Sequence, residues 1–161
     1  MKTYKLSYEL EDKDIDSFVS ILRSSDFFYD FEVDIVISIF DETMEKGQKE
    51  SEYFWIKLIQ EGKIRGFAVF GPNPSTVGSW DLYWLAVSEE SRNKHFGTTI
   101  LNEVEIMARE EECRVLWIET AGRPLYLPTR KFYESCDYEK VAQLKDYYDE
   151  GDDKVIYRKV L

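Results

Sequence analysis

Few of the residues that build disulfide or metal sites occur in this sequence. Its 161 residues include two cysteines, Cys113 and Cys136, and a single histidine, His95. Two cysteines make no disulfide framework, and these two lack the spacing of metal ligands. A zinc site is not expected with one histidine. We therefore expect reduced, packed thiols, no bound metal and a cytoplasmic location.

Long hydrophobic runs are also lacking. The apolar stretches are short and interrupted, as at residues 67–70. The N-terminal segment MKTYKLSYEL alternates in polarity. It has neither the apolar centre nor the small-residue cleavage site of a signal peptide. No segment is expected to cross or enter a membrane.

Basic residues are also few in comparison with acidic ones. Lysine and arginine total 21 against 32 aspartates and glutamates, which gives a net charge of -11. A nucleic acid is bound first through its phosphates by a basic surface. An anionic membrane surface likewise attracts basic segments. The composition argues against both partners and is compatible with a cationic one.

Hydrophobic residues make up 43% of the chain and aromatic residues 16%, which is enough for one core. We find no repeat, low-complexity tract or flexible linker, so residues 1–161 are expected to form a single domain. The expected helices cover residues 12–22, 30–46, 97–111 and 124–135. The expected strands cover residues 2–8, 52–60, 64–70, 80–87, 114–120, 138–147 and 154–160. This β-α-α-β-β-β-α-β-α-β-β order predicts an α/β or α+β fold with a mixed sheet.

Turn residues separate the strands in the middle of the chain. Glu61 and Gly62 predict a hairpin turn. The prolines of Gly71-Pro72-Asn73-Pro74 cannot both sit inside a strand ladder. The third strand is therefore expected to end at Phe70.

The segment with most chemical information is a strand, a basic turn and the start of a helix, residues 80–98. A helix start offers unpaired N–H groups and a positive dipole end, which together bind phosphate. Arg92 and Lys94 add positive charge, and Gly97 permits a close approach of the backbone. Neither G-x-x-x-x-G-K-[ST] nor G-x-G-x-x-G is present, which disfavours a nucleoside triphosphatase or a dinucleotide dehydrogenase. By itself, the turn favours an ordinary strand-to-helix connection with solvated charges.

This segment resembles motif A of the GNAT superfamily, the acyl-CoA-dependent N-acyltransferases. The family loop reads Arg/Gln-x-x-Gly-x-Gly/Ala, and Arg92 and Gly97 match its first and last positions, with His95 at the usual middle glycine. Downstream, residues 132–138 (FYESCDY) resemble the family's F-Y-E-x-x-G-F, with Asp137 at the usual glycine. The asparagine common seven positions before the motif's tyrosine is Tyr126 here. The element order agrees with this fold across essentially the whole chain.

The resemblance implies a GNAT fold in which the fourth and fifth strands run parallel and splay apart, with acetyl-CoA between them. Free backbone groups of Leu85, Ala86 and Val87 would bind the pantetheine arm. The turn would hold the pyrophosphate through Arg92, Asn93, Lys94, His95, Phe96, Gly97 and Thr98.

For catalysis, Tyr133 aligns with the family's tyrosine that protonates the departing thiolate; a neutral phenol can donate that proton. Two carboxylates are candidates for the base that accepts the amine proton. Asp81 matches the glutamate that some members use, and Glu119 lies at the end of the next strand. Alternation places Asp81, Tyr83, Leu85 and Val87 on one face. Alternatively, Asp81 faces solvent, and Glu119 caps the following loop or binds a cation without proton transfer.

Aromatic residues gather on the same strands: Trp80, Tyr83, Trp84 and Trp117. We expect at least two of them to pack in the core, and we assign Tyr83, Trp84 and Tyr126 to the acceptor pocket. The predicted function is transfer of an acetyl group from acetyl-CoA to a primary amine of a small cationic molecule. The alternatives are acetylation of a protein lysine or N-terminus, and a non-catalytic acyl-CoA-binding module. A homodimer is compatible with such a fold.

Overall fold

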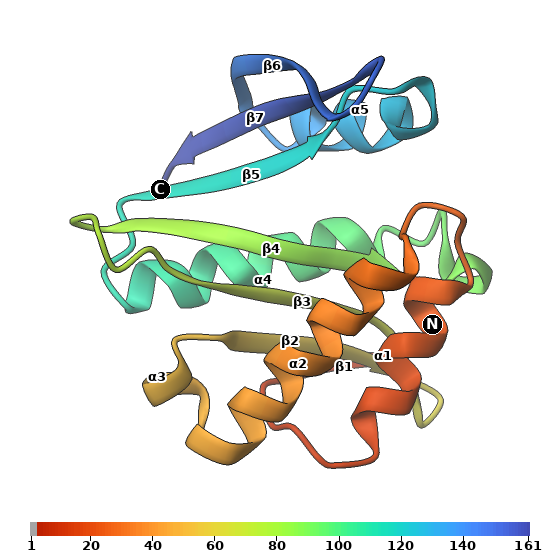
Figure 1. Ribbon diagram of the computed structural model, residues 1–161. Helices are drawn as coiled ribbons and strands as arrows, with labels where there is room; N and C mark the ends of the chain where they lie inside the picture. The colour runs from red at the N-terminus through yellow and green to blue at the C-terminus, as the bar shows by residue number, and fades with distance from the viewer. Residues whose placement is uncertain (1–2) are drawn as a thin grey trace.

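The computed structural model describes residues 3–161, which form one seven-stranded sheet with helices on both faces (Figure 1). The strands are β1 (Tyr4–Ser7), β2 (Phe54–Gln60), β3 (Lys63–Pro72), β4 (Ser79–Val87), β5 (Val115–Ala121), β6 (Glu139–Asp149) and β7 (Asp152–Val160). The helices are α1 (Asp14–Arg23), α2 (Asp30–Lys46), α3 (Gln48–Ser51), α4 (Phe96–Glu110) and α5 (Leu127–Ser135), with the short 3-10 helices η1 (Glu89–Ser91) and η2 (Pro124–Tyr126). The predicted class and order are confirmed; α3 and η1 were not predicted, and the helix predicted at residues 124–135 is divided into η2 and α5. The first expected strand starts at residue 2, which lies outside the described residues.

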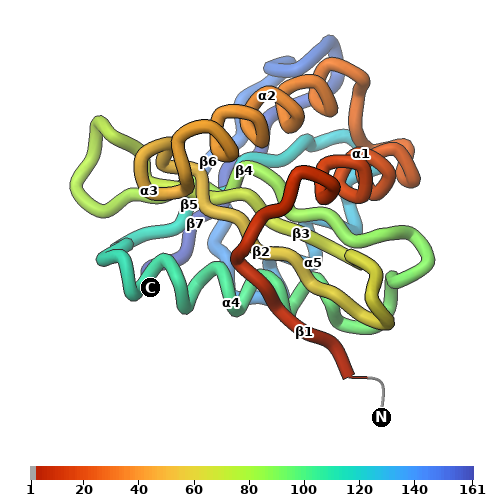
Figure 2. The backbone as a smooth tube through the Cα atoms, turned by 90° about the horizontal axis from the view of Figure 1, so that it is seen from below, coloured from red at the N-terminus to blue at the C-terminus, as the bar shows by residue number. Residues whose placement is uncertain are grey.

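The sheet is mixed, with the strand order β1-β2-β3-β4-β5-β7-β6. All neighbouring strands are antiparallel except β4 and β5. Helices α1 and α2 cover one face of the sheet, and α4 covers the other, as Figures 1 and 2 both show. None of the helices between residues 3 and 161 combines the length and the apolar character that a bilayer span requires.

Each face of the sheet has its own hydrophobic core. On the α1–α2 face, the ring of Phe18 lies 4.4 Å from that of Phe67 and 5.3 Å from that of Trp55. Strand β2 is buried on both faces, which explains its nearly continuous apolar sequence FWIKLIQ. Its one charged residue, Lys57, is buried and pairs with Asp14 at 2.6 Å, so the charge is compensated.

The ends of α2 are set by the residues that flank it. The backbone N–H of Tyr29 donates to the carboxylate of Glu32 at 2.8 Å, a capping interaction at the first turn. Gly47 follows the last turn with φ of 84°, which a glycine adopts without strain. The predicted limits of this helix are confirmed, and its start holds Tyr29 and Glu32 at the edge of the sheet opening described below.

Strand β3 continues to Pro72, so the prediction that it ends at Phe70 is wrong. Pairing with β2 stops at Phe70, while pairing with β4 continues to Pro72 opposite Trp80. Beyond Phe70, β3 has no strand partner on its β2 side among the described residues. A proline there costs no ladder hydrogen bond, because its missing N–H has no partner to lose.

Strands β4 and β5 are paired over only part of their length. The parallel register runs from Ser79 opposite Val115 to Leu82 opposite Ile118. Beyond that point β4 stays paired with β3, and β5 with β7, but the two strands no longer pair with each other. The predicted splay is confirmed, and it opens a gap in the middle of the sheet.

Candidate active site

A cavity of about 1200 Å³ lies where β4 and β5 separate. Its walls come from the end of β4, the α1–α2 connection, the turn before α4, the start of α5 and the β6–β7 hairpin. Every predicted site residue except Lys94 lines it: Asp81, Tyr83, Trp84, Leu85, Ala86, Val87, Arg92, Asn93, His95, Phe96, Gly97, Thr98, Glu119, Tyr126 and Tyr133. Residues from separate parts of the sequence thus meet at one site.

The register of β3 and β4 shifts beside this cavity. Trp84 lies opposite Val69, whereas Leu82 lies opposite Phe70. Strand β4 therefore contains one additional residue, Tyr83, at this point. Such a bulge reverses the side-chain alternation on its two sides.

The predicted common face of Asp81, Tyr83, Leu85 and Val87 is wrong because of this bulge. Leu85 and Val87 pack against the core on the α4 face. Both neighbours of Asp81 in the strand also belong to that core. Asp81 therefore points to the opposite face, toward α1 and α2.

The two candidate bases share one face, and the candidate acid lies on the other. Glu119 follows Ile118, a residue of the core on the α4 face, so alternation turns Glu119 toward α1 and α2. Tyr133 of α5 belongs to the core on the α4 face. Since all three line one cavity, the cavity passes through the sheet at the strand separation.

The turn before α4 exposes backbone donors to the cavity. Within residues 3–161, no backbone acceptor pairs with the N–H of Asn93, Lys94 or His95. The N–H of Thr99 makes the bond to the carbonyl of His95 that starts the helix, at 3.0 Å. Asn93 and His95 have φ of 63° and 60°, in the left-handed region. That conformation accounts for the glycine usual at the position of His95, and Asp137, with φ of 68°, is a second such case.

Side chains of this turn differ in their placement. The Arg92 guanidinium lies over the ring of Phe27, 5.5 Å from its centroid. Lys94 is exposed, with its ammonium 6.0 Å from the centroid of the Phe96 ring, and its side chain does not line the cavity. A Cβ on Gly97 would lie 3.3 Å from the ring of Phe132. Gly97 therefore also permits the close packing of α4 against α5.

Tyr133 combines a buried ring with a hydroxyl that has no partner in the described part of the chain. The residue is 6% exposed, and its ring packs near Tyr138 and Tyr157, each with centroids 6.1 Å away. Burial raises the pKa of the Tyr133 phenol well above its usual range. The side chain is therefore a neutral hydrogen-bond donor at physiological pH.

The two carboxylates differ in their surroundings. Burial raises the pKa of Asp81, and the nearby charge of Glu119 raises it further. Glu119 forms an ion pair with Lys154 at 2.7 Å. Asp81 has no ion pair among residues 3–161, which leaves it the better placed to take up a proton.

The aromatic residues divide between packing and lining. Trp80 is 5% exposed and belongs to the core, as expected. Trp117 donates its indole N–H to Ser79 at 3.3 Å. Tyr83 lies at the cavity wall with its ring centroid 5.7 Å from that of Tyr53. Trp84 lines the cavity from the α1–α2 face.

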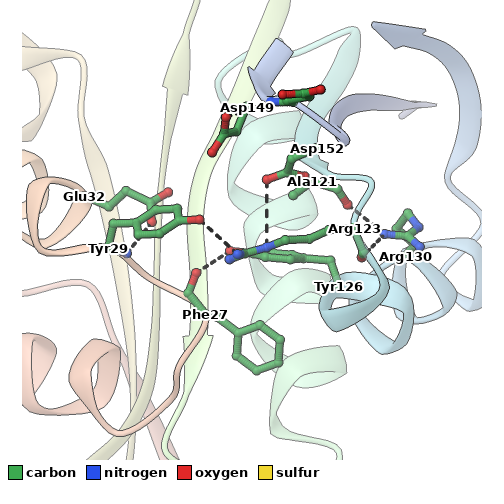
Figure 3. Close-up of polar contacts among 10 residues, drawn as sticks. Phe27, Tyr29, Glu32, Ala121, Arg123, Tyr126, Arg130, Asp149 and Asp152 are labelled. Carbon is green, nitrogen blue, oxygen red and sulfur yellow. Dashed lines mark hydrogen bonds and ion pairs between the residues drawn. The ribbon is translucent and has the colours of Figure 1, made fainter. Parts of the chain in front are cut away.

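A bridge of polar contacts, not foreseen from the sequence, joins the α1–α2 connection to the segment after β5 (Figure 3). The Tyr126 hydroxyl donates to the Phe27 carbonyl. Arg123 donates to the Tyr29 hydroxyl at 2.9 Å and lies 3.8 Å from the Asp152 carboxylate. Arg123 also lies over the rings of Tyr29 and Tyr126, at 5.2 and 5.1 Å. We call these five residues the bridge; they lie on both sides of the strand separation and line the cavity.

Comparisons with known proteins relate the chain to one family. A sequence profile described as the acetyltransferase (GNAT) family matches residues 16–138. An N-alpha-acetyltransferase of Saccharolobus solfataricus is 30% identical over 97 residues, which are 60% of this chain. The match spans 57% of that protein, a little over half its length.

Solved structures share the fold over nearly the whole chain. A protein of the GNAT family from Desulfovibrio desulfuricans is 32% identical, with a TM-score of 0.94 over 98% of this chain and 99% of that one. An aminoglycoside 6'-N-acetyltransferase, solved as a complex with coenzyme A, is 16% identical. Its TM-score is 0.77 over 97% of this chain and 96% of that one, a likeness of fold alone.

Proposed function

This chain belongs to the acetyltransferase (GNAT) family, and from that membership we propose that it transfers an acetyl group from acetyl-CoA to a primary amine of a small cationic molecule. The observation that carries the proposal is the cavity through the sheet. It has unpaired backbone N–H groups and a neutral phenol toward α4 and α5, and carboxylates toward α1 and α2. The two substrates of a direct transfer can meet there from opposite faces.

The residues present fit acetyl-CoA, which supplies the activated acetyl group. The free N–H groups at the start of α4 and the guanidinium of Arg92 suit a pyrophosphate. Beyond Leu82, the edge of β4 that faces β5 has no strand partner. Backbone groups of Leu85, Ala86 and Val87 on this edge are available to hold the pantetheine arm and to polarise the thioester carbonyl.

The proposed proton transfers use one residue on each face. As the amine nitrogen bonds to the acetyl carbon, Asp81 accepts the proton that the nitrogen loses, directly or through a water. As the carbon–sulfur bond breaks, Tyr133 donates its proton to the sulfur. A carboxylate with a raised pKa and a neutral phenol suit these two tasks.

The amine panel that tests the proposal uses acetyl-CoA at a saturating concentration and measures thiol release. It includes small amines, an amino sugar, a lysine peptide and peptides with a free N-terminus. We expect a small cationic amine to have the highest kcat/KM of all the acceptors in the panel. If acetyl-CoA binds but no amine raises thiol release above the rate without acceptor, a non-catalytic acyl-CoA-binding role replaces this proposal.

Acetylation of protein N-termini is the second candidate. The similarity to the archaeal N-alpha-acetyltransferase favours it, although that match covers only 60% of this chain. A peptide N-terminus with a higher kcat/KM than every small amine in the same panel would establish it in place of the first.

A further inference from the structure

The acceptor side of the cavity has more negative charge than a single reacting amine needs. Five carboxylates line it, and two cations accompany them: Arg123 in the wall and Lys154 beside Glu119. The formal charges leave a surplus of three negative charges. The carboxylates are Glu32, Asp81, Glu119, Asp149 and Asp152.

Among these five carboxylates, Asp152 is notable for its burial and for an oxygen without a hydrogen-bond donor. It is only 8% exposed, and its Oδ1 is buried with no hydrogen-bond donor within residues 3–161. Its Oδ2 lies 3.8 Å from Arg123 Nε, which is beyond hydrogen-bond distance. A buried carboxylate oxygen without a donor costs free energy, so an ammonium group that pairs with the Asp152 carboxylate from the cavity would offset part of that cost.

Arg123 does not supply the missing donor in this geometry: its Nε, the donor nearest to Asp152, lies 3.8 Å from Oδ2 and is itself buried without a hydrogen-bond partner in the described part of the chain. Its Nη1 donates to the Tyr29 hydroxyl at 2.9 Å, and its guanidinium lies over two tyrosine rings. Figure 3 shows Asp152 beside Arg123, with the Asp149 carboxylate pointing to the same side as Glu32. Asp149 and Asp152 face each other as the last pair of the β6–β7 hairpin. The hairpin thus presents two carboxylates to the cavity from one turn.

Aromatic rings complete this region. Tyr29 and Phe31 are stacked with centroids 5.4 Å apart, and both line the cavity while remaining about half exposed or more. Tyr148 adds a third ring from the hairpin. Burial raises the pKa of Tyr148 to about 12, with contributions from Glu119 and Glu32. Aromatic faces beside carboxylates bind ammonium groups well, since both attract a cation.

We propose that Asp149 and Asp152, with Glu32 opposite, form a second ammonium site, and that the acceptor is a diamine or polyamine. One amine reacts beside Asp81, while the second stays protonated and is held by the hairpin carboxylates. Only one acetyl group moves, so the product keeps one positive charge. This inference rests on the proposed function above, because it names the acceptor class for that same site.

The test compares acceptors that differ only in the second amine. The probes are the diamine putrescine and the monoamine n-butylamine, with kcat/KM measured for each at saturating acetyl-CoA. We expect putrescine to exceed butylamine at least tenfold, which corresponds to about 1.4 kcal/mol. Asp149→Asn and Asp152→Asn should each reduce that ratio by about fivefold or more. Glu150→Gln removes the same charge from the same turn outside the cavity and should leave the ratio unchanged.

Two controls separate a folding defect and a loss of turnover from a loss of acceptor binding. Melting temperatures identify an Asp152→Asn protein that has not folded, and the exposed Asp149 gives a variant without that risk. Calorimetry with CoA present measures the binding of both probes without turnover. Equal kcat/KM and equal affinity for the two probes would overturn the second site while leaving the acetyltransferase proposal intact. Selective putrescine binding with no turnover of any amine would support the site and refute the proposed activity.

Discussion

At the residue scale, the proposed chemistry depends on the hydroxyl of Tyr133. Tyr133→Phe removes that oxygen and keeps the ring contacts with Tyr138 and Tyr157. We expect an unchanged melting temperature and acetyl-CoA affinity, and a turnover reduced at least tenfold, because general acid catalysis contributes about 10²- to 10⁴-fold. Steady-state thiol release and calorimetry measure the two effects separately. Turnover within about twofold of wild type, a few tenths of a kcal/mol in barrier, would make Tyr133 a packing residue.

Asp81 and Glu119 are distinguished by the pH dependence of the rate. The base must be ionised, and burial together with Glu119 raises the pKa of Asp81. The wild-type kcat/KM should therefore fall as the pH drops through that raised pKa. In Asp81→Asn the rate should be lower and this acidic limb should vanish. Glu119→Gln is the matched comparison: it leaves Asp81 in place but removes the charge that helps to raise the Asp81 pKa, so the acidic limb should remain and move to lower pH.

Other pH profiles of the Asp81 and Glu119 variants would contradict this assignment of the base. Should Asp81→Asn keep the acidic limb and Glu119→Gln lose it, Glu119 would be the base. Profiles that match wild type in both variants would indicate that water accepts the proton. The melting temperature of Asp81→Asn is expected to be no lower than wild type at neutral pH, because a raised carboxyl pKa means that the native state disfavours the charge.

Residues with a local sequence pattern were predictable, and residues that meet through the fold were not. Arg92, Gly97 and Tyr133 stand at fixed positions of short motifs, and all three line the cavity. Arg123 contacts a tyrosine 94 positions earlier in the chain, a separation that no local pattern records. The only local sign of this contact is the aromatic segment Phe27-Phe28-Tyr29 between the first two helices.

At the element scale, the strand separation and the bridge shape the site. The limits of most helices and strands follow from apolar periodicity and turn residues. The bulge at Tyr83 does not follow from them, because a bulged strand and a regular strand are built from the same types of residue. It changes which residues face the cavity, and so the predicted grouping of Asp81 with Leu85 failed although the limits of β4 were nearly correct.

The bridge is expected to hold the α1–α2 connection over the cavity. Tyr126→Phe removes the hydrogen bond to the Phe27 carbonyl. A hydrogen bond of this kind contributes about 0.5–1.5 kcal/mol, so amide exchange in residues 25–30 should accelerate about two- to tenfold. The acceptor KM should rise, because Tyr29 and Glu32 lose their fixed position. Hydrogen exchange and steady-state kinetics measure these two effects.

Tyr4→Phe is the control for that variant. Tyr4 is 48% exposed on β1, and its hydroxyl has no partner among residues 3–161. Its removal should change neither the exchange of residues 25–30 nor the acceptor KM. Equal exchange rates in Tyr126→Phe and wild type would show that the connection is held by packing alone.

At the scale of the whole molecule, charge is distributed unevenly around one cavity. The chain has a net charge of -11, yet the turn proposed to bind the pyrophosphate includes two of its 21 basic residues. An acidic surface raises the encounter rate of a cationic acceptor and lowers that of an anionic cofactor. The basic turn must therefore offset a repulsive field locally, and the affinity for acetyl-CoA should depend on the arginine that lines the cavity.

Acetyl-CoA should accordingly stabilise the folded protein, and Arg92 should account for part of the effect. A ligand at 100 times its Kd adds about 2.7 kcal/mol to the free energy of unfolding. A tenfold weaker Kd at the same concentration reduces this to about 1.4 kcal/mol. For a domain of this size, 1 kcal/mol corresponds to about 2–4 °C in Tm. We expect Arg92→Gln to halve the Tm increase produced by acetyl-CoA, while Lys94→Gln, which changes the net charge equally but lies outside the cavity, keeps the full increase. Thermal unfolding of both variants with and without acetyl-CoA measures this difference, and an equal reduction in both would mean that the net charge of the turn, not the position of Arg92, determines binding.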